Sequence, residues 1–307
     1  MAAELKTLLI ENNIKAKHAA CALSSYCVIT KKVTMPLMGG QAGGKSGKAA
    51  PELDEEKIIE AEVENIIPFP LKEINYSYQM MGLVENDENM VNTIIVAAKK
   101  EIVDGFIATF QTAGLNLVIL DVDIFALTNL VEQIYNPQES SVVVVDIGAA
   151  VTNMAIIKGE SVGFTREILL GGRYLTSQIE KSLNLSYEDA EKKKINGDDE
   201  VLYLFEDFIF NIASEINKTI NFYASTNPNE TLSKIYLTGG TSLLKGLKEK
   251  IGDYTNIEVE YLNPFAIFTE SPQFVIDDPT QLDAYEDFKE FNGVALQLSS
   301  RVLDLEQ

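Results

Sequence analysis

Four consecutive valines constrain the fold of this chain more than any other feature. They occupy positions 142–145 and are followed by Asp146, Ile147 and Gly148. A strand without alternating polar residues is typical of a sheet covered on both faces, as in α/β proteins. After the glycine turn, Thr152 begins a second β-rich stretch. The pattern predicts a buried strand whose hairpin tip carries a carboxylate, glycine N–H groups and a hydroxyl.

Such a tip suits phosphate and Mg²⁺ together. Gly148 lets the backbone approach a ligand closely, and Asp146 can hold Mg²⁺ through metal-bound water. A D-x-G turn also occurs in many proteins simply as a turn. The hairpin alone is therefore a weak indication of a site.

A second glycine-rich segment spans residues 235–247. It predicts a strand, then Thr238-Gly239-Gly240-Thr241-Ser242, then a helix. The start of that helix would offer free N–H groups and the positive end of the helix dipole. The alternative is a plain glycine turn with Thr241 or Ser242 as the helix N-cap.

A third segment, Gly39 to Ser46, matches the phosphate-binding pattern G-x-x-x-x-G-K-S. That chemistry requires a buried strand before the loop and a helix directly after it. Gly47 and Pro51 interrupt the place where the helix should begin. We expect a flexible inserted loop, and a P-loop NTPase built on Lys45 is the alternative.

Charge and rare residues exclude several classes of function. The chain has 25 Lys and Arg against 46 Asp and Glu, a net charge of −21, so we expect no nucleic-acid partner and no attraction to anionic lipid. His18 is the single histidine, and Cys21 and Cys27 form no CxxC pair, so the usual zinc ligands are missing. No apolar run reaches the roughly 18 residues of a membrane span. We expect a cytoplasmic protein without direct membrane insertion.

Periodicity and turn residues predict two mixed halves, hence an α/β or α+β architecture with a boundary at residues 136–141. Helices are expected at 2–13, 54–67, 101–114, 124–135, 173–184, 186–196, 199–225 and near 288–304. Strands are expected at 19–35 (two strands with a turn), 74–84, 92–100, 115–123, 141–172 (a β-rich block), 233–238 and 257–262.

The order of the motifs carries more weight than each motif alone. A D-I-G-x-x-x-T hairpin at 146–152 precedes a strand-T-G-G segment by some ninety residues, the order of the phosphate-2 and adenosine motifs of the actin-like ATPase superfamily. Segments 60–82, 163–194 and 263–268 resemble the PilM family of type IV pilus assembly proteins. The sequence also resembles the cell-division protein FtsA, a relative of that family with the same inserted subdomain.

This resemblance implies a bilobed actin-like fold that binds ATP in the cleft between its lobes. Residues 1–140 would form the first lobe, with an inserted subdomain at about 30–122. Residues 141–287 would form the second lobe, and 288–307 a helix that returns to the first. The superfamily opens with a phosphate-1 hairpin, and this chain shows none near residue 1, so we expect an incomplete first lobe and weakened nucleotide binding.

The resemblance also assigns site residues. Asp146, Gly148 and Thr152 would face the phosphates and Mg²⁺, with Asp146 as the metal-binding residue. Gly239, Gly240 and Thr241 would face the nucleoside and the α-phosphate.

Two further assignments are weaker. Lys193 or Lys194 could approach the ribose or adenine, although a run of lysines is usually a solvated helix face. Asp123 stands where the superfamily positions water, although a capping role explains it equally well.

The resemblance implies a scaffold that docks the N-terminal cytosolic peptide of a membrane-anchored partner, PilN. The peptide would lie in a groove between the first lobe and the inserted subdomain. The same resemblance implies contacts with other inner-membrane pilus assembly proteins and self-association. It also implies recruitment to the membrane through a partner. The alternatives are an FtsA-like division protein and an active ATPase or kinase of the superfamily.

Overall fold

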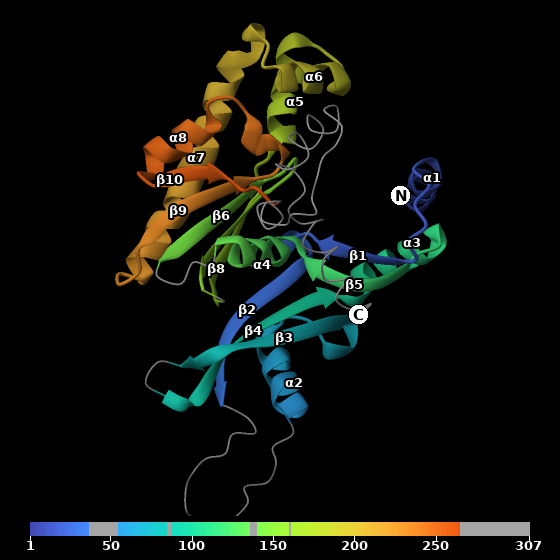
Figure 1. Ribbon diagram of the computed structural model, residues 1–307, viewed down its shortest axis with the longest axis vertical. Coiled ribbons are helices and arrows are strands. Elements are labelled where there is room, and N and C mark those ends of the chain that lie inside the picture. The colour runs from blue at the N-terminus through green and yellow to red at the C-terminus, as the bar shows by residue number, and fades with distance from the viewer. Residues whose placement is uncertain (37–54, 85–86, 136–139, 160, 265–307) are drawn as a thin grey trace, which may run out of the picture. The chain divides into compact units, whose positions relative to one another are not determined.

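The computed structural model describes residues 1–36, 55–84, 87–135, 140–159 and 161–264 (Figure 1). The chain divides into two compact units, unit 1 before Asp121 and unit 2 from Asp121 onward. The P-loop-like segment with Lys45, the end of the expected second lobe and the expected helix at 288–307 lie outside the described residues.

Unit 1 contains a two-stranded sheet, β1–β5, and an antiparallel three-stranded sheet in the order β2–β4–β3. Its elements are α1 (Ala2–Glu11), β1 (His18–Leu23), η1 (Ser25–Cys27), β2 (Val28–Pro36), α2 (Glu55–Ile66), η2 (Leu71–Glu73), β3 (Ile74–Val84), β4 (Asp87–Lys99), α3 (Lys100–Ala113) and β5 (Asn116–Val122).

Helix α2 covers one face of the three-stranded sheet. Its apolar residues recur every fourth position, so Ile59 and Val63 lie on one side of the helix together with Ile67 just beyond its end. These side chains pack against Met35 on β2 and Ile95 on β4, and all are buried. Three acidic residues of α2, Glu56, Glu60 and Glu64, stay exposed beside this buried stripe.

Unit 2 is built on one mixed five-stranded sheet in the order β10–β9–β6–β7–β8. Strands β10, β9 and β6 run parallel, whereas β6, β7 and β8 run antiparallel. Its elements are α4 (Asp123–Tyr135), β6 (Ser141–Ile147), β7 (Thr152–Lys158), β8 (Ser161–Ile168), α5 (Gly172–Leu183), α6 (Tyr187–Asn196), η3 (Asp199–Val201), α7 (Leu202–Thr226), β9 (Leu232–Thr238), η4 (Gly240–Leu243), α8 (Leu247–Thr255) and β10 (Glu258–Tyr261).

The valine run is buried because helices cover both faces of β6. Val143 and Val145 belong to the core formed with α7, whereas Val142 and Val144 pack against α4 (Figure 1). All four are buried. The prediction of a two-sided central strand is confirmed.

Helix α4 belongs to unit 2, although the sequence suggested a boundary after it at 136–141. Leu127, Leu130 and Val131 on α4 pack against the α4 face of β6. Burying these side chains ties the helix to the strand that follows it. The polar residues 136–141 therefore connect two elements of one unit, and the lobe ranges expected from the family remain a prediction.

Candidate functional site

Two strand ends bring the two glycine-rich turns together. Strands β6 and β9 are parallel neighbours, with Asp146 opposite Thr238 at their carboxyl ends. Gly239 follows with a φ of +85°, which glycine adopts readily. A Cβ at Gly239 would lie 2.3 Å from Asp146 Oδ1. The adenosine-type turn therefore packs directly against the carboxylate of the D-x-G turn.

Hydrogen bonds from the start of α5 stabilise the D-x-G turn. Gly148 N donates to Val151 O at 3.0 Å and closes the turn. Gly172 N donates to Gly148 O at 3.0 Å, and Arg173 N donates to Ala149 O at 2.7 Å. The first amides of α5 thus satisfy the carbonyls of the turn, while its tip at Ala149 and Ala150 stays exposed.

The threonines of both motifs already have intramolecular partners. Thr241 is buried, and its hydroxyl donates to Gly148 O at 3.0 Å, which links the two turns across 93 positions of sequence. Thr152 is fully buried and donates to Leu170 O at 2.8 Å. Gly240 is exposed beside them. Contacts of these residues with a nucleotide stay predictions.

The helix expected directly after the second glycine turn begins later. Residues 240–243 form a 3₁₀ turn, and α8 starts at Leu247 with Gly246 as its N-cap. Neither Thr241 nor Ser242 caps the helix, and the Ser242 hydroxyl instead donates to Gly239 O at 2.7 Å. The N-cap interpretation is wrong, because a short i→i+3 turn uses these residues first.

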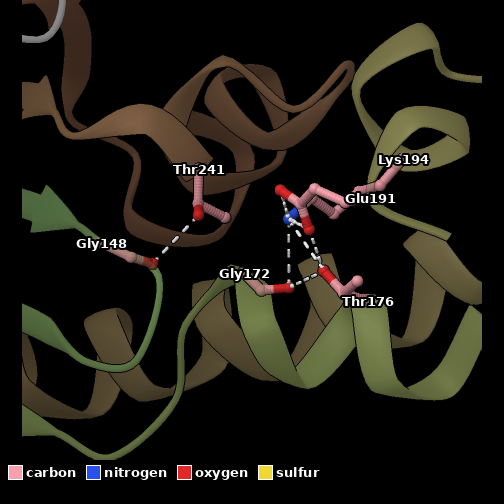
Figure 2. Close-up of polar contacts among 6 residues, drawn as sticks. All are labelled: Gly148, Gly172, Thr176, Glu191, Lys194 and Thr241. Carbon is pink, nitrogen blue, oxygen red and sulfur yellow. Dashed lines mark hydrogen bonds and ion pairs between the residues drawn. The ribbon is translucent and has the colours of Figure 1, made fainter. Parts of the chain in front are cut away.

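A lysine from α6, Lys194, lies beside the start of α5 and the second glycine turn. Lys194 Nζ donates to Glu191 Oε2 at 2.8 Å, to Thr176 Oγ1 at 3.0 Å and to Gly172 O at 3.4 Å (Figure 2). A Cβ at Gly172 would lie 2.3 Å from Thr241 Oγ1 and 3.2 Å from Lys194 Nζ. Gly172 is therefore the point where α5, α6 and the second glycine turn meet.

The lysine run is only partly a solvated face. Lys192 is 74% exposed, whereas Lys194 is 10% exposed and ion-paired with Glu191. Lys193 pairs with Asp198 and Glu200 at the end of α6. Of the two lysines considered for a nucleotide contact, Lys194 is the one that lies beside Gly172 and Thr241.

The surroundings of the Asp146 carboxyl disfavour its ionised form. Burial raises its pKa from 3.8 to about 7, and the nearby Asp123 carboxylate contributes to the shift. Asp123 begins α4; its Oδ1 accepts from Ile124 N and its Oδ2 accepts from Asn153 Nδ2 at 3.2 Å. Asp123, the first residue of α4, therefore contacts the site through Asn153.

A row of polar side chains crosses the sheet at this level. Asp146 pairs with Thr238 on one side and with Asn153 on the other, and Asn153 pairs with Glu167 on β8. All four lie on the α4 face, because their neighbours in sequence point into the core with α7. Asn153 is 3% exposed, and its Oδ1 has no hydrogen-bond partner.

Sequence reasoning missed Asn153, Gly172, Thr176 and Glu191. A sequence does not show which residues face each other across strands, so Asn153 gave no signal. The pair Gly171-Gly172 did carry a usable sequence signal, because a glycine pair before a helix permits close approach of another backbone.

The neighbouring carboxyls of Asp146 and Asp123 bear on the metal-binding role predicted for Asp146. The ionised form of a carboxyl such as that of Asp146, whose pKa is raised by burial and by a neighbouring carboxylate, is stabilised when a cation lies beside it. Over the described part of the chain, no group of three or more His, Cys, Asp or Glu has the geometry of a metal site. The role of Asp146 as a Mg²⁺ ligand stays a prediction, and water or phosphate oxygens would have to complete the coordination shell.

The sequence model of the family described as "Type IV pilus assembly protein PilM" matches residues 1–284. The chain belongs to this PilM family. A solved structure titled "PilM-PilN type IV pilus biogenesis complex" is similar over 98% of this chain and 84% of that chain, with 26% identity and a TM-score of 0.81. The α/β, actin-like fold class predicted from the sequence is confirmed.

Curated relatives of this PilM-family chain include the cell division protein FtsA of two Staphylococcus epidermidis strains. Each is 22% identical over 250 residues, which is 72% of this chain and 53% of the relative. The chain thus spans about half the length of the curated relatives it matches. Among the helices that the structure describes, none has both the length and the apolar character that crossing a membrane requires.

Proposed function

We propose that this protein is an ATP–Mg²⁺-binding scaffold of type IV pilus assembly that docks the N-terminal peptide of a membrane-anchored PilN-like partner. The similarity to a PilM–PilN complex over nearly the whole chain carries this proposal. Docking would recruit the protein to the inner membrane from the cytoplasm, because the partner supplies the membrane anchor.

The nucleotide part of the proposal rests on the turns at the ends of β6 and β9. Their exposed backbone at Ala149, Ala150 and Gly240 can approach phosphate closely. Bound Mg²⁺ would neutralise Asp146 and supply charge for the phosphates. Thr241 and Lys194 would hold the two turns and α5 in place rather than transfer any group, so nucleotide would act as a conformational ligand.

Calorimetry of ATP–Mg²⁺ with the wild type and Asp146→Asn tests this part. We expect binding to the wild type and at least a tenfold loss in the variant, since the charge that holds Mg²⁺ is gone. Asp207→Asn, on the exposed side of α7, is the matched control and should bind as the wild type does. Equal binding by all three proteins contradicts the proposed metal residue.

The docking part has a candidate place within unit 1. A cavity of about 360 Å³ opens between η1, the start of β2, the end of β4 and the start of α3. Its lining is mainly apolar, with Val28, Ile74 and Ala98 among its residues, and Lys99 at its edge lies 4.9 Å from the centre of the Phe69 ring. A short apolar peptide segment fits such a lining.

Fluorescence anisotropy with the N-terminal peptide of the PilN protein of the same organism tests docking. Ala98→Phe would fill the cavity, and Tyr26→Ala would remove a lining side chain that is 69% exposed. We expect both to weaken binding about tenfold or more. Tyr187→Ala, an exposed tyrosine of unit 2, should have no effect. Unchanged binding in both cavity variants would move the docking place elsewhere.

A further inference from the structure

Strand β3 forms an open edge of the sheet in unit 1. Its eleven residues pair with β4 on one side, from Ile74 opposite Lys99 to Val84 opposite Asp87. On its other side no strand pairs with it in the ranges that the structure describes. An open edge presents unpaired N–H and C=O groups to which another extended chain can add.

The two edges of this sheet differ in their protection. Strand β2 carries Lys31 and Lys32 and ends at Pro36, which are residues that block strand addition. Strand β3, with the sequence INYSYQMMGLV, contains no charged residue and no proline. Its register against β4 shifts twice, at Met80/Gly82 and at Leu83/Val84, so the segment 74–80 before both shifts is regular. Within the described ranges, the β2 edge carries residues that block strand addition and the β3 edge does not.

The surface beside β3 is acidic. Glu56, Glu60 and Glu64 recur every fourth residue on α2 and are exposed, so they form a stripe along the helix. Burial raises the pKa of Tyr76 on β3, and the carboxylates of Glu60 and Glu56 raise it further. The stripe therefore lies close to β3, on the face of the sheet that α2 covers.

We propose that β3 is a docking edge for an extended segment of a partner protein that carries Lys or Arg at alternate positions. Main-chain hydrogen bonds to residues 74–80 would add the segment as a fourth strand. Alternate side chains of a strand point to one face, so every second residue of the partner would face Glu56 and Glu60. The charge of the stripe selects a basic segment, and it repels a second copy of this chain, whose net charge is −21.

This docking edge shares Ile74 with the cavity proposed for PilN, and the other residues of the two places differ. The cavity lies at the ends of β2 and β4, whereas the regular part of β3 runs along the opposite side of β4. The two proposals can therefore fail independently.

The experiment uses the full chain and a peptide of about nine alternating valine and lysine residues, within the length range of natural strands. We expect binding, together with slowed hydrogen exchange of amides in 74–80. A peptide with the same charge but N-methylated at alternate amides is the control for general attraction to an acidic protein. It should bind at least tenfold more weakly, because it cannot complete the ladder.

Variants of the protein test the acidic stripe. Glu56→Gln/Glu60→Gln should weaken the basic peptide about three- to tenfold, in line with exposed charge pairs. Glu180→Gln/Glu188→Gln, on the helices α5 and α6, makes the same change of charge in unit 2 and should leave affinity unchanged. Neither pair of substitutions should alter binding of the PilN peptide.

Three results would overturn the proposal. Equal binding of the N-methylated peptide would show that the ladder plays no part. Equal losses in the two double variants would show that only net charge matters. A concentration-dependent dimer, strengthened by Glu56→Gln/Glu60→Gln, would assign the edge to a second copy of this chain instead.

Discussion

Replacing Asp146 with asparagine should make the ligand-free protein more stable at neutral and alkaline pH. The pKa of this carboxyl is raised to about 7 because it is buried and lies near Asp123. The native state therefore binds the proton more tightly than the unfolded state does. Stability is lost as the pH rises from about 4 to about 7, while the native carboxyl is forced to ionise. Asparagine has nearly the same shape and does not titrate.

The size of the effect follows from the shift. About three pKa units correspond to about 4 kcal/mol at full burial. The carboxyl is enclosed but the residue keeps some exposed surface, so solvent screening reduces the expected gain to about 2–3 kcal/mol at pH 8. Near pH 4 the gain should fall below about 1 kcal/mol, and below about pH 3 it should vanish, since both states then hold the proton.

Urea unfolding of the wild type and Asp146→Asn from pH 4 to pH 8 measures the difference directly. Asp207→Asn is the control and should track the wild type at every pH. Adding Mg²⁺ at pH 8 should stabilise the wild type and leave Asp146→Asn unchanged, because a ligand that binds only the native state adds to stability. A gain that is absent, or that does not change between pH 4 and pH 8, would refute the assigned electrostatics.

Two further substitutions test the packing of the site by urea unfolding. Gly239→Ala places a Cβ 2.3 Å from Asp146 Oδ1 at a φ of +85° and should cost about 3 kcal/mol or more, whereas Gly197→Ala, with a φ of +66° and open space, should cost only about 1–2 kcal/mol of left-handed strain. A similar loss in both would contradict the close approach. Lys194→Met should cost about 1–3 kcal/mol by leaving partly buried acceptors unpaired, whereas Lys192→Met, on the solvated side of α6, should change stability by less than about 0.5 kcal/mol.

Much of the fold was predictable because local signals agreed with the tertiary structure. The valine run is buried on both sides, as its lack of alternation predicted. Helix α3 ends where Gly114 adopts a left-handed conformation, as its position predicted. The helix after the second glycine turn was placed too early, because the 3₁₀ turn at 240–243 is stabilised by a contact with Gly148 that is far away in sequence.

The site was less predictable than the fold. Asp146 and Gly239 belong to recognisable motifs, and the structure brings them into contact. Asn153 lies beside Asp146 only through the register of β6 and β7. Lys194 and Lys192 both belong to α6, and they differ in the side of the helix from which each side chain projects. Register and helix orientation depend on long-range packing, which local sequence patterns do not contain.

The link between Thr241 and Gly148 also bears on how the protein folds. It joins positions 93 residues apart, and the parallel pairing of β6 with β9 spans a similar distance. Closing such a loop costs chain entropy before its contacts compensate, so folds with distant pairings form slowly. On the ribosome, β6 is complete long before β9 has been synthesised. Until then, the edge of β6 that pairs with β9 is open in the nascent chain and is exposed to incorrect pairing. The ligand site should therefore be among the last parts of unit 2 to form during synthesis.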